Sequence, residues 1–124
     1  LEETGDYAQA ERQGRACVEL EPRDGWGWHA VAHVFEMRHQ PREGVAWLAP
    51  NATTWATESF LAVHNHWHLA LFHLELGELD AVLRLYDGAI GGTGSSLVLE
   101  LIDRSAMLWR LMLRGAELGG RWEA

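Results

Sequence analysis

Apolar residues recur along most of the chain at spacings of three and four, and no long stretch alternates apolar with polar residues. That periodicity is typical of helices with one buried face, and β-branched residues are few. Proline, glycine and helix-capping residues divide the pattern into successive helices. We expect helices at residues 7–20, 25–37, 41–48, 60–77, 79–89 and 97–114, and a last one from about residue 117. The fold class is therefore expected to be all-α.

Local signals set several of these helix ends. Pro22 stops the first helix, and Asp24 is expected to cap the second because its carboxylate can accept a bond from a first-turn amide. Pro41 suits the first turn of the third helix. Gly77 is expected to end the central helix at 60–77, and Ser96 is expected to cap the long helix at 97–114.

Small and apolar residues recur at fixed distances along these helices. Leu1, Gly5 and Ala10 have counterparts 34 residues later, at Phe35, His39 and Gly44. A second set recurs after 38 residues and pairs Ala32 with Ala70, Phe35 with His73, Gly44 with Val82, Leu48 with Tyr86, and Gly77 with Gly115. A period of about 34 residues in paired helices is the signature of tetratricopeptide repeats. Within each pair of helices, Ala32 is expected to be buried against Gly44, and Ala70 against Val82.

Three segments resemble the tetratricopeptide repeat protein 38 family. They are HAVAHVFEM at 29–37, LAVHNHWHLALFH at 61–73, and LYD at 85–87 together with residues 103–122. The resemblance implies tetratricopeptide-like helical hairpins stacked in a right-handed superhelix, an α-α solenoid. The family is longer than this chain, so we expect a partial repeat domain with Leu1 and Trp122 poorly packed at its open ends.

One domain is expected over residues 1–124, with repeats at about 1–24, 25–58, 59–94 and 95–124. The net charge of −8 argues against nucleic acid or an anionic membrane as a partner. Cys17, the single cysteine, has no internal partner for a disulfide, which favours a reducing compartment such as the cytoplasm.

In repeats of this kind the first helix of each pair lines the concave face. The resemblance therefore implies a groove lined by Trp26, His29, His33, Glu36, His64, Trp67 and His68. Imidazole, indole and carboxylate groups can hydrogen-bond to and stack on a ligand. The first functional hypothesis is a binding or scaffold module that recognises a protein, a peptide or a small polar ligand and needs no cofactor.

The second hypothesis is a metal-dependent enzyme of unknown reaction. His29 and His33 are four residues apart, so both can bind one ion from one helix face. Zinc and non-haem iron accept nitrogen and oxygen ligands of this kind. Glu36 lies on the same face, and His64 or His68 would complete the set. The expected ligands of this divalent metal are His29, His33, Glu36 and His64, converging on one concave pocket.

A third interpretation is that the histidines are packed, with each ring nitrogen bonded to a neighbour. It applies first to His66 and His73, which face the partner helix of their own pair. Tyr86, Glu36 and Glu75 are the neighbours expected for such bonds.

Overall fold

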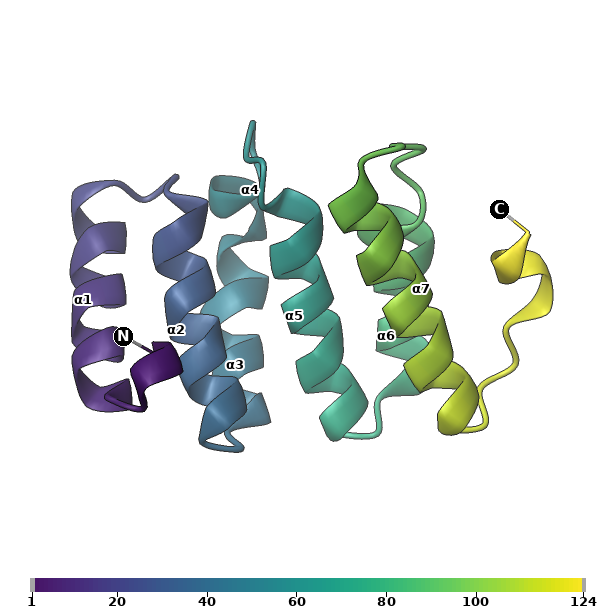
Figure 1. Ribbon diagram of the computed structural model, residues 1–124, viewed down its shortest axis with the longest axis horizontal. Helices are drawn as coiled ribbons and strands as arrows, with labels where there is room; N and C mark the ends of the chain where they lie inside the picture. The colour runs from purple at the N-terminus through teal and green to yellow at the C-terminus, as the bar shows by residue number, and fades with distance from the viewer. Residues whose placement is uncertain (1, 124) are drawn as a thin grey trace.

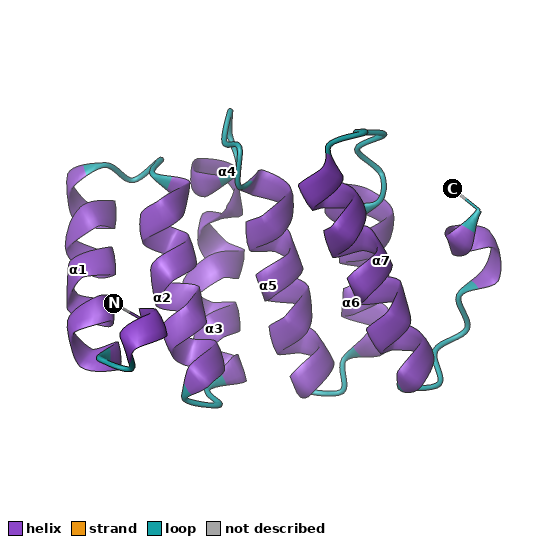
Figure 2. Ribbon diagram, viewed as in Figure 1, coloured by secondary structure: helices purple, strands orange, loops and turns teal. Residues whose placement is uncertain are grey.

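The computed structural model describes residues 2–123, which form helices and connecting loops with no strand among them (Figures 1 and 2). The α-helices are α1 (Tyr7–Leu20), α2 (Gly25–Met37), α3 (Pro41–Leu48), α4 (Ala52–Trp55), α5 (Ala62–Glu75), α6 (Leu79–Leu85) and α7 (Val98–Leu113). Short 3₁₀ turns lie at Glu2–Thr4, Ala49–Asn51 and Gly119–Trp122, and a π turn at Tyr86–Ile90 follows α6. The expected all-α fold class is confirmed.

The three N-terminal helices begin and end where the sequence predicts. Asp24 caps α2, since its Oδ1 accepts the Trp26 amide at 3.1 Å, and Pro41 occupies the first turn of α3. The central helix is shorter than predicted, because Phe60 lies outside α5 and is exposed. Ser96 does not cap α7, whose N-cap is Leu97.

Two expectations for the C-terminal half are wrong in detail. The helix expected at 79–89 changes from α to π geometry at Tyr86, so α6 itself ends at Leu85. The helix expected from residue 117 is only the 3₁₀ turn Gly119–Trp122. Gly119 has a positive φ of 56°, which an α-helix does not accommodate.

Figure 1 shows the helices standing in a row, with α3 behind α2 and beside α5, and α6 behind α7. α1 packs on α2, and both α2 and α3 pack on α5. α5 in turn packs on α6 and α7. Helices α2 and α5 run in the same direction, so one flank of α2 faces the opposite flank of α5.

Residues with a positive φ precede or follow helices at regular intervals. Positive φ angles occur at Gly5 (83°), His39 (54°), Gly77 (74°) and Gly115 (75°), at successive spacings of 34, 38 and 38 residues (39 − 5, 77 − 39, 115 − 77). After α2, α5 and α7 the amide two residues into the turn bonds back across the helix end: Gln40 to Phe35, Glu78 to His73 and Ala116 to Leu111, at 2.8, 2.9 and 3.1 Å. This is the bond of a Schellman motif. The 38-residue spacing that recurs in the sequence is thus the spacing of this turn, and the 34-residue spacing separates His39 from the positive φ of Gly5.

Small residues lie buried on both helices of each pair. Ala32, Gly44, Ala70 and Val82 are all buried, as expected. A Cβ at Gly44 would lie 2.4–2.5 Å from three ring atoms of Phe72, which is on α5. Gly44 therefore makes room for α5, in addition to the contact with Ala32 that the sequence predicts.

The ends of the described chain are less packed than its centre. Trp122 is 49% exposed, in line with the expectation, whereas Leu1 lies outside the described residues. Within residues 2–123, every helix is too short or too polar to span a bilayer.

Candidate metal centre

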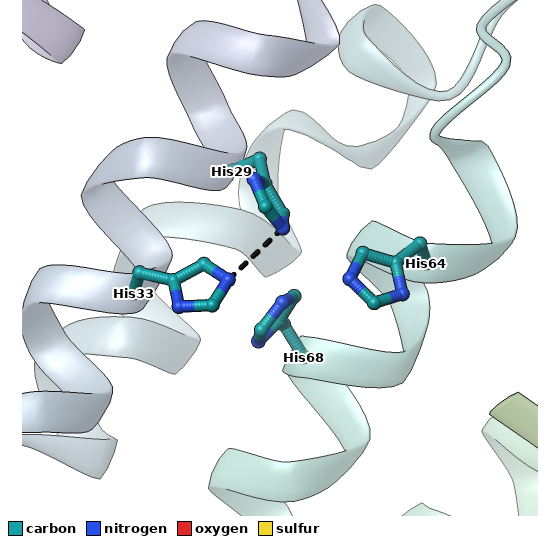
Figure 3. A group of neighbouring side chains, drawn as sticks. All are labelled: His29, His33, His64 and His68. Atoms are coloured by element: carbon teal, nitrogen blue, oxygen red, sulfur yellow. Dashed lines mark hydrogen bonds between the residues drawn. The ribbon is translucent and has the colours of Figure 1, made fainter. Parts of the chain in front are cut away.

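Four histidines from two neighbouring helices come together between α2 and α5. α2 supplies His29 and His33, and α5 supplies His64 and His68, each pair one helical turn apart. One ring nitrogen from each lies within 4.8 Å of all the others. Figure 3 shows the four rings pointing toward one another across the gap between the helices. We call these residues the four-histidine group.

The hydrogen bonds of the group determine which nitrogens face its centre. Nδ1 of His64 lies 2.9 Å from Oδ2 of Asp103, and Nδ1 of His68 lies 3.0 Å from Oε2 of Glu36. Since a carboxylate accepts, both Nδ1 atoms donate, and each Nε2 keeps its lone pair. Figure 3 shows the other nitrogen of each of these two rings turned toward the group.

Three of the four Nε2 atoms are in close contact or without a partner. Nε2 of His29 and Nε2 of His33 are 3.0 Å apart. Nε2 of His68 is fully buried and has no hydrogen-bond partner among residues 2–123. A buried nitrogen with a lone pair and no donor beside it is the arrangement that a metal ion would complete.

The separations suit a transition-metal ion after small side-chain rotations. Zinc binds imidazole nitrogens at about 2.0–2.1 Å, which places tetrahedral ligands about 3.3 Å from one another. The His29–His33 separation of 3.0 Å is already of this size. The wider separations, up to 4.8 Å, need the rings to move inward by about 1 Å or slightly more.

Burial keeps His29 and His68 in the protonation state that metals require. Desolvation, followed by the charges of His68, His33 and His64, lowers the pKa of His29 to about 3. Desolvation also lowers the pKa of His68, although its hydrogen bond to Glu36 opposes that change. Both rings are therefore neutral at pH 7, and neutral imidazole is the form that binds a metal.

Glu36 is the charged partner of this group. Burial acts to raise the pKa of its carboxyl, but the hydrogen bond from His68 and the charges of His68, His33 and Arg110 bring that pKa below the usual value. The carboxylate is therefore ionised at neutral pH and accepts the His68 bond with full charge.

Two tryptophans flank the group on its two helices. Trp67 stacks on His64, with ring centroids 5.6 Å apart and planes 8° apart. Trp26 meets His29 edge-on at 5.7 Å and is 62% exposed. The guanidinium of Arg110 lies 5.3 Å from the centre of the Trp67 ring. Trp67 thus packs into the structure beside the group, whereas Trp26 stands at its solvent side.

The seven residues expected to line a groove fall into three roles. His29, His33, His64 and His68 form the four-histidine group. Trp26 and Trp67 flank it. Glu36, which was expected as a ligand, is not among the four grouped residues, and its carboxylate bonds to Nδ1 of His68. The ligand set of His29, His33, Glu36 and His64 stays a prediction beside the set of four histidines that the structure brings together.

Asp103 belongs to the site and was missed from the sequence. It lies on α7, is 3% exposed and shares the buried face of that helix with Met107 and Leu111. The signal was present: a carboxylate occupies a position of the apolar stripe where the helical period calls for an apolar residue.

His66 and His73 lie outside the four-histidine group. Nδ1 of His66 donates to the Ala62 carbonyl at 2.8 Å, and its ring packs on Trp55. Nδ1 of His73 lies 2.6 Å from Oε2 of Glu78. Both histidines have the packed environment expected for them, although their partners are not the expected Tyr86, Glu36 or Glu75.

A cleft of about 350 Å³ lies beside the group. Phe35, Phe72 and Leu71 contribute apolar surface to it, and Glu36 and Arg110 contribute charge. Glu36 therefore faces both this cleft and His68.

No model of a known protein family matches the sequence, and no solved structure matches the fold to a significant degree. The resemblance to the tetratricopeptide repeat protein 38 family therefore stays a prediction that rests on the sequence.

Proposed function

We propose that this chain binds one divalent transition-metal ion through the Nε2 atoms of His29, His33, His64 and His68. The observation that carries the proposal is that four ring nitrogens, one from each histidine, lie within 4.8 Å of one another. In addition, Nε2 of His68 is buried and has no hydrogen-bond partner among residues 2–123. Leaving such a nitrogen unsatisfied costs about 1–3 kcal/mol. Coordination to an ion removes that cost.

The donor set narrows the choice of ion. Four imidazoles suit zinc, copper, nickel or iron, whereas magnesium and calcium prefer oxygen ligands. Zinc is the first choice because four protein nitrogens complete its preferred tetrahedron. A catalytic zinc normally keeps one position for water, so a complete set of four protein ligands favours a structural ion. We therefore rank a metal-stabilised binding module above the metal-dependent enzyme.

Elemental analysis of the chain, purified without a histidine tag, tests the proposal. We expect one zinc per chain, and calorimetric titration of zinc into chelator-treated protein should give the same stoichiometry. His33→Ala should weaken zinc binding at least tenfold. His73→Ala is the matched control, because His73 is also bonded to a carboxylate but lies outside the group. A folded wild-type chain that binds no divalent transition metal would overturn the proposal.

The helices are further proposed to form tetratricopeptide-like repeats in a right-handed superhelix. The support is the recurring turn at residues 39, 77 and 115, together with the paired helices α2–α3 and α5–α6. An experimental structure at atomic resolution tests this. Placement of α3 and α6 on opposite sides of the row would overturn it.

A second candidate function is recognition of a peptide or a small polar ligand. It is favoured by exposed Trp26 and by the cleft that carries Glu36 and Arg110. The test is binding of an immobilised degenerate peptide library by chelator-treated protein, compared with Trp26→Ala. Selection of the same peptides by both proteins, or of none by either, would count against this candidate. The expected cytoplasmic location rests on Cys17 alone and stays a prediction.

A further inference from the structure

One carboxylate behind the four-histidine group comes from a third helix. Asp103 lies on α7, whereas all four histidines lie on α2 and α5. It is 3% exposed, and the hydrogen bond to Nδ1 of His64, 2.9 Å long, is the contact that its carboxylate makes with the group. The bond joins residues 39 positions apart.

We propose that Asp103 is a positioning residue of the metal centre, which holds His64 with Nε2 toward the ion and links metal occupancy to the packing of α7. The inference rests on the metal site proposed above.

The first step of the argument concerns the tautomer of His64. A neutral imidazole carries its proton on one nitrogen only, and the carboxylate of Asp103 keeps that proton on Nδ1. Nε2 then has the lone pair that a metal needs. A carboxylate behind a metal-bound histidine also raises the basicity of the ligand and fixes the plane of its ring.

The second step is the effect of the metal on the same bond. When Nε2 donates its lone pair to a cation, the ring becomes more positive and its Nδ1 proton more acidic. The hydrogen bond to the Asp103 carboxylate then strengthens. Because coupling is reciprocal, an ion that strengthens the bond also favours the docked position of α7, and docked α7 favours ion binding.

Glu36 supports His68 in a similar way but with a different consequence. It lies on α2, which already carries two histidines of the group, so its bond brings no additional helix to the site. Its side chain is also 39% exposed, compared with 5% for Asp103. Asp103 is therefore the carboxylate expected to transmit metal binding from α5 to α7.

The test compares the wild-type chain with Asp103→Asn and with Glu78→Gln. Asparagine keeps the size of aspartate and removes its charge. Glu78→Gln is the matched control, because it changes a carboxylate bonded to Nδ1 of a histidine on α5 outside the group. Zinc affinity is measured by competition with a chromophoric chelator, and cobalt binding by visible absorption. Amide hydrogen exchange with and without zinc measures the protection of each helix.

In the wild-type chain, zinc should slow exchange in α2, α5 and α7. Asp103→Asn should weaken zinc binding by about 10- to 100-fold and change the cobalt spectrum. At saturating zinc it should retain the protection of α2 and α5 but lose that of α7. Glu78→Gln should behave as wild type in all three measurements.

The outcomes separate the inference from the metal site itself. A wild-type chain that binds no zinc overturns both. A wild-type chain that binds zinc, with Asp103→Asn equal to it in affinity and in α7 protection, overturns the inference alone. If Asp103→Asn fails to fold by circular dichroism, the wild-type exchange data decide: zinc that protects α2 and α5 but not α7 overturns the inference.

Discussion

Oε2 of Glu36 lies 3.0 Å from Nδ1 of His68, so this carboxylate supports a histidine of the four-histidine group without joining it. Glu36→Gln keeps a hydrogen-bond acceptor but removes its charge. We expect a loss of zinc affinity of about tenfold, smaller than the loss in His33→Ala, which removes a ligand. Competition titration measures both. An unchanged affinity in Glu36→Gln would show that the ion does not depend on the orientation of His68.

Zinc should stabilise the folded chain. At a free concentration of 100 times its dissociation constant, an ion bound only by the folded state adds about 2.7 kcal/mol to the free energy of unfolding. For a chain of 124 residues that corresponds to a rise in Tm of roughly 10 °C. Scanning calorimetry with zinc and with chelator measures the shift, and His33→Ala should show little of it. Equal shifts in both proteins would place the ion elsewhere.

Chelator-treated protein should lose stability as the pH falls below about 6.5. Burial lowers the pKa of His29 to about 3 and also lowers the pKa values of His66 and His68. The unfolded chain therefore binds more protons than the folded chain between about pH 6.5 and pH 3, and acid favours unfolding. Denaturant titrations at pH 7.0, 6.0 and 5.0 measure how the free energy of unfolding changes with pH. This range lies above the pKa values of most carboxylates.

His29→Gln provides the comparison for that series. It removes the histidine whose pKa burial lowers to about 3, so the dependence of stability on pH between 7.0 and 5.0 should become weaker. A wild-type chain whose stability is constant over this range would contradict the burial of these imidazoles.

Gly44→Ala should destabilise the junction between α3 and α5. The added Cβ would lie 2.4–2.5 Å from the Phe72 ring, and overpacking of this kind costs about 1–3 kcal/mol. Gly88→Ala is the matched control, because among the described residues no atom lies within 4 Å of the Cβ it would add. Urea denaturation compares the two, and equal stabilities would mean that Phe72 moves aside without cost.

Helix positions could be predicted because their signals are local. Asp24, Pro41 and Gly77 act through the backbone beside them, and each marks a helix end in the structure. The change to π geometry at Tyr86 has no comparable signal. Phe60 was expected in the central helix because no proline or glycine separates it from that helix, but it is exposed and outside α5.

The candidate site was only partly predictable because it depends on how two helices sit beside each other. The sequence places His29, His33 and Glu36 on one face of a helix, and His64 and His68 on one face of another. Whether Glu36 or His68 completes the group depends on the relative shift of α2 and α5 along their axes. The helical periodicity of a sequence carries no information about that shift. For the same reason, the sequence did not reveal the contact that Asp103 makes from α7.

The 38-residue interval between equivalent turns has a consequence for duplication of this architecture. The histidine pairs are separated by 35 residues (64 − 29 and 68 − 33), so they occupy different places in their respective units. At the next junction the equivalent positions hold Trp67, Leu71, Ile102 and Ala106. Copying one unit would extend the row of helices without copying the metal centre, and inserting a unit between α3 and α5 would separate the two halves of the centre.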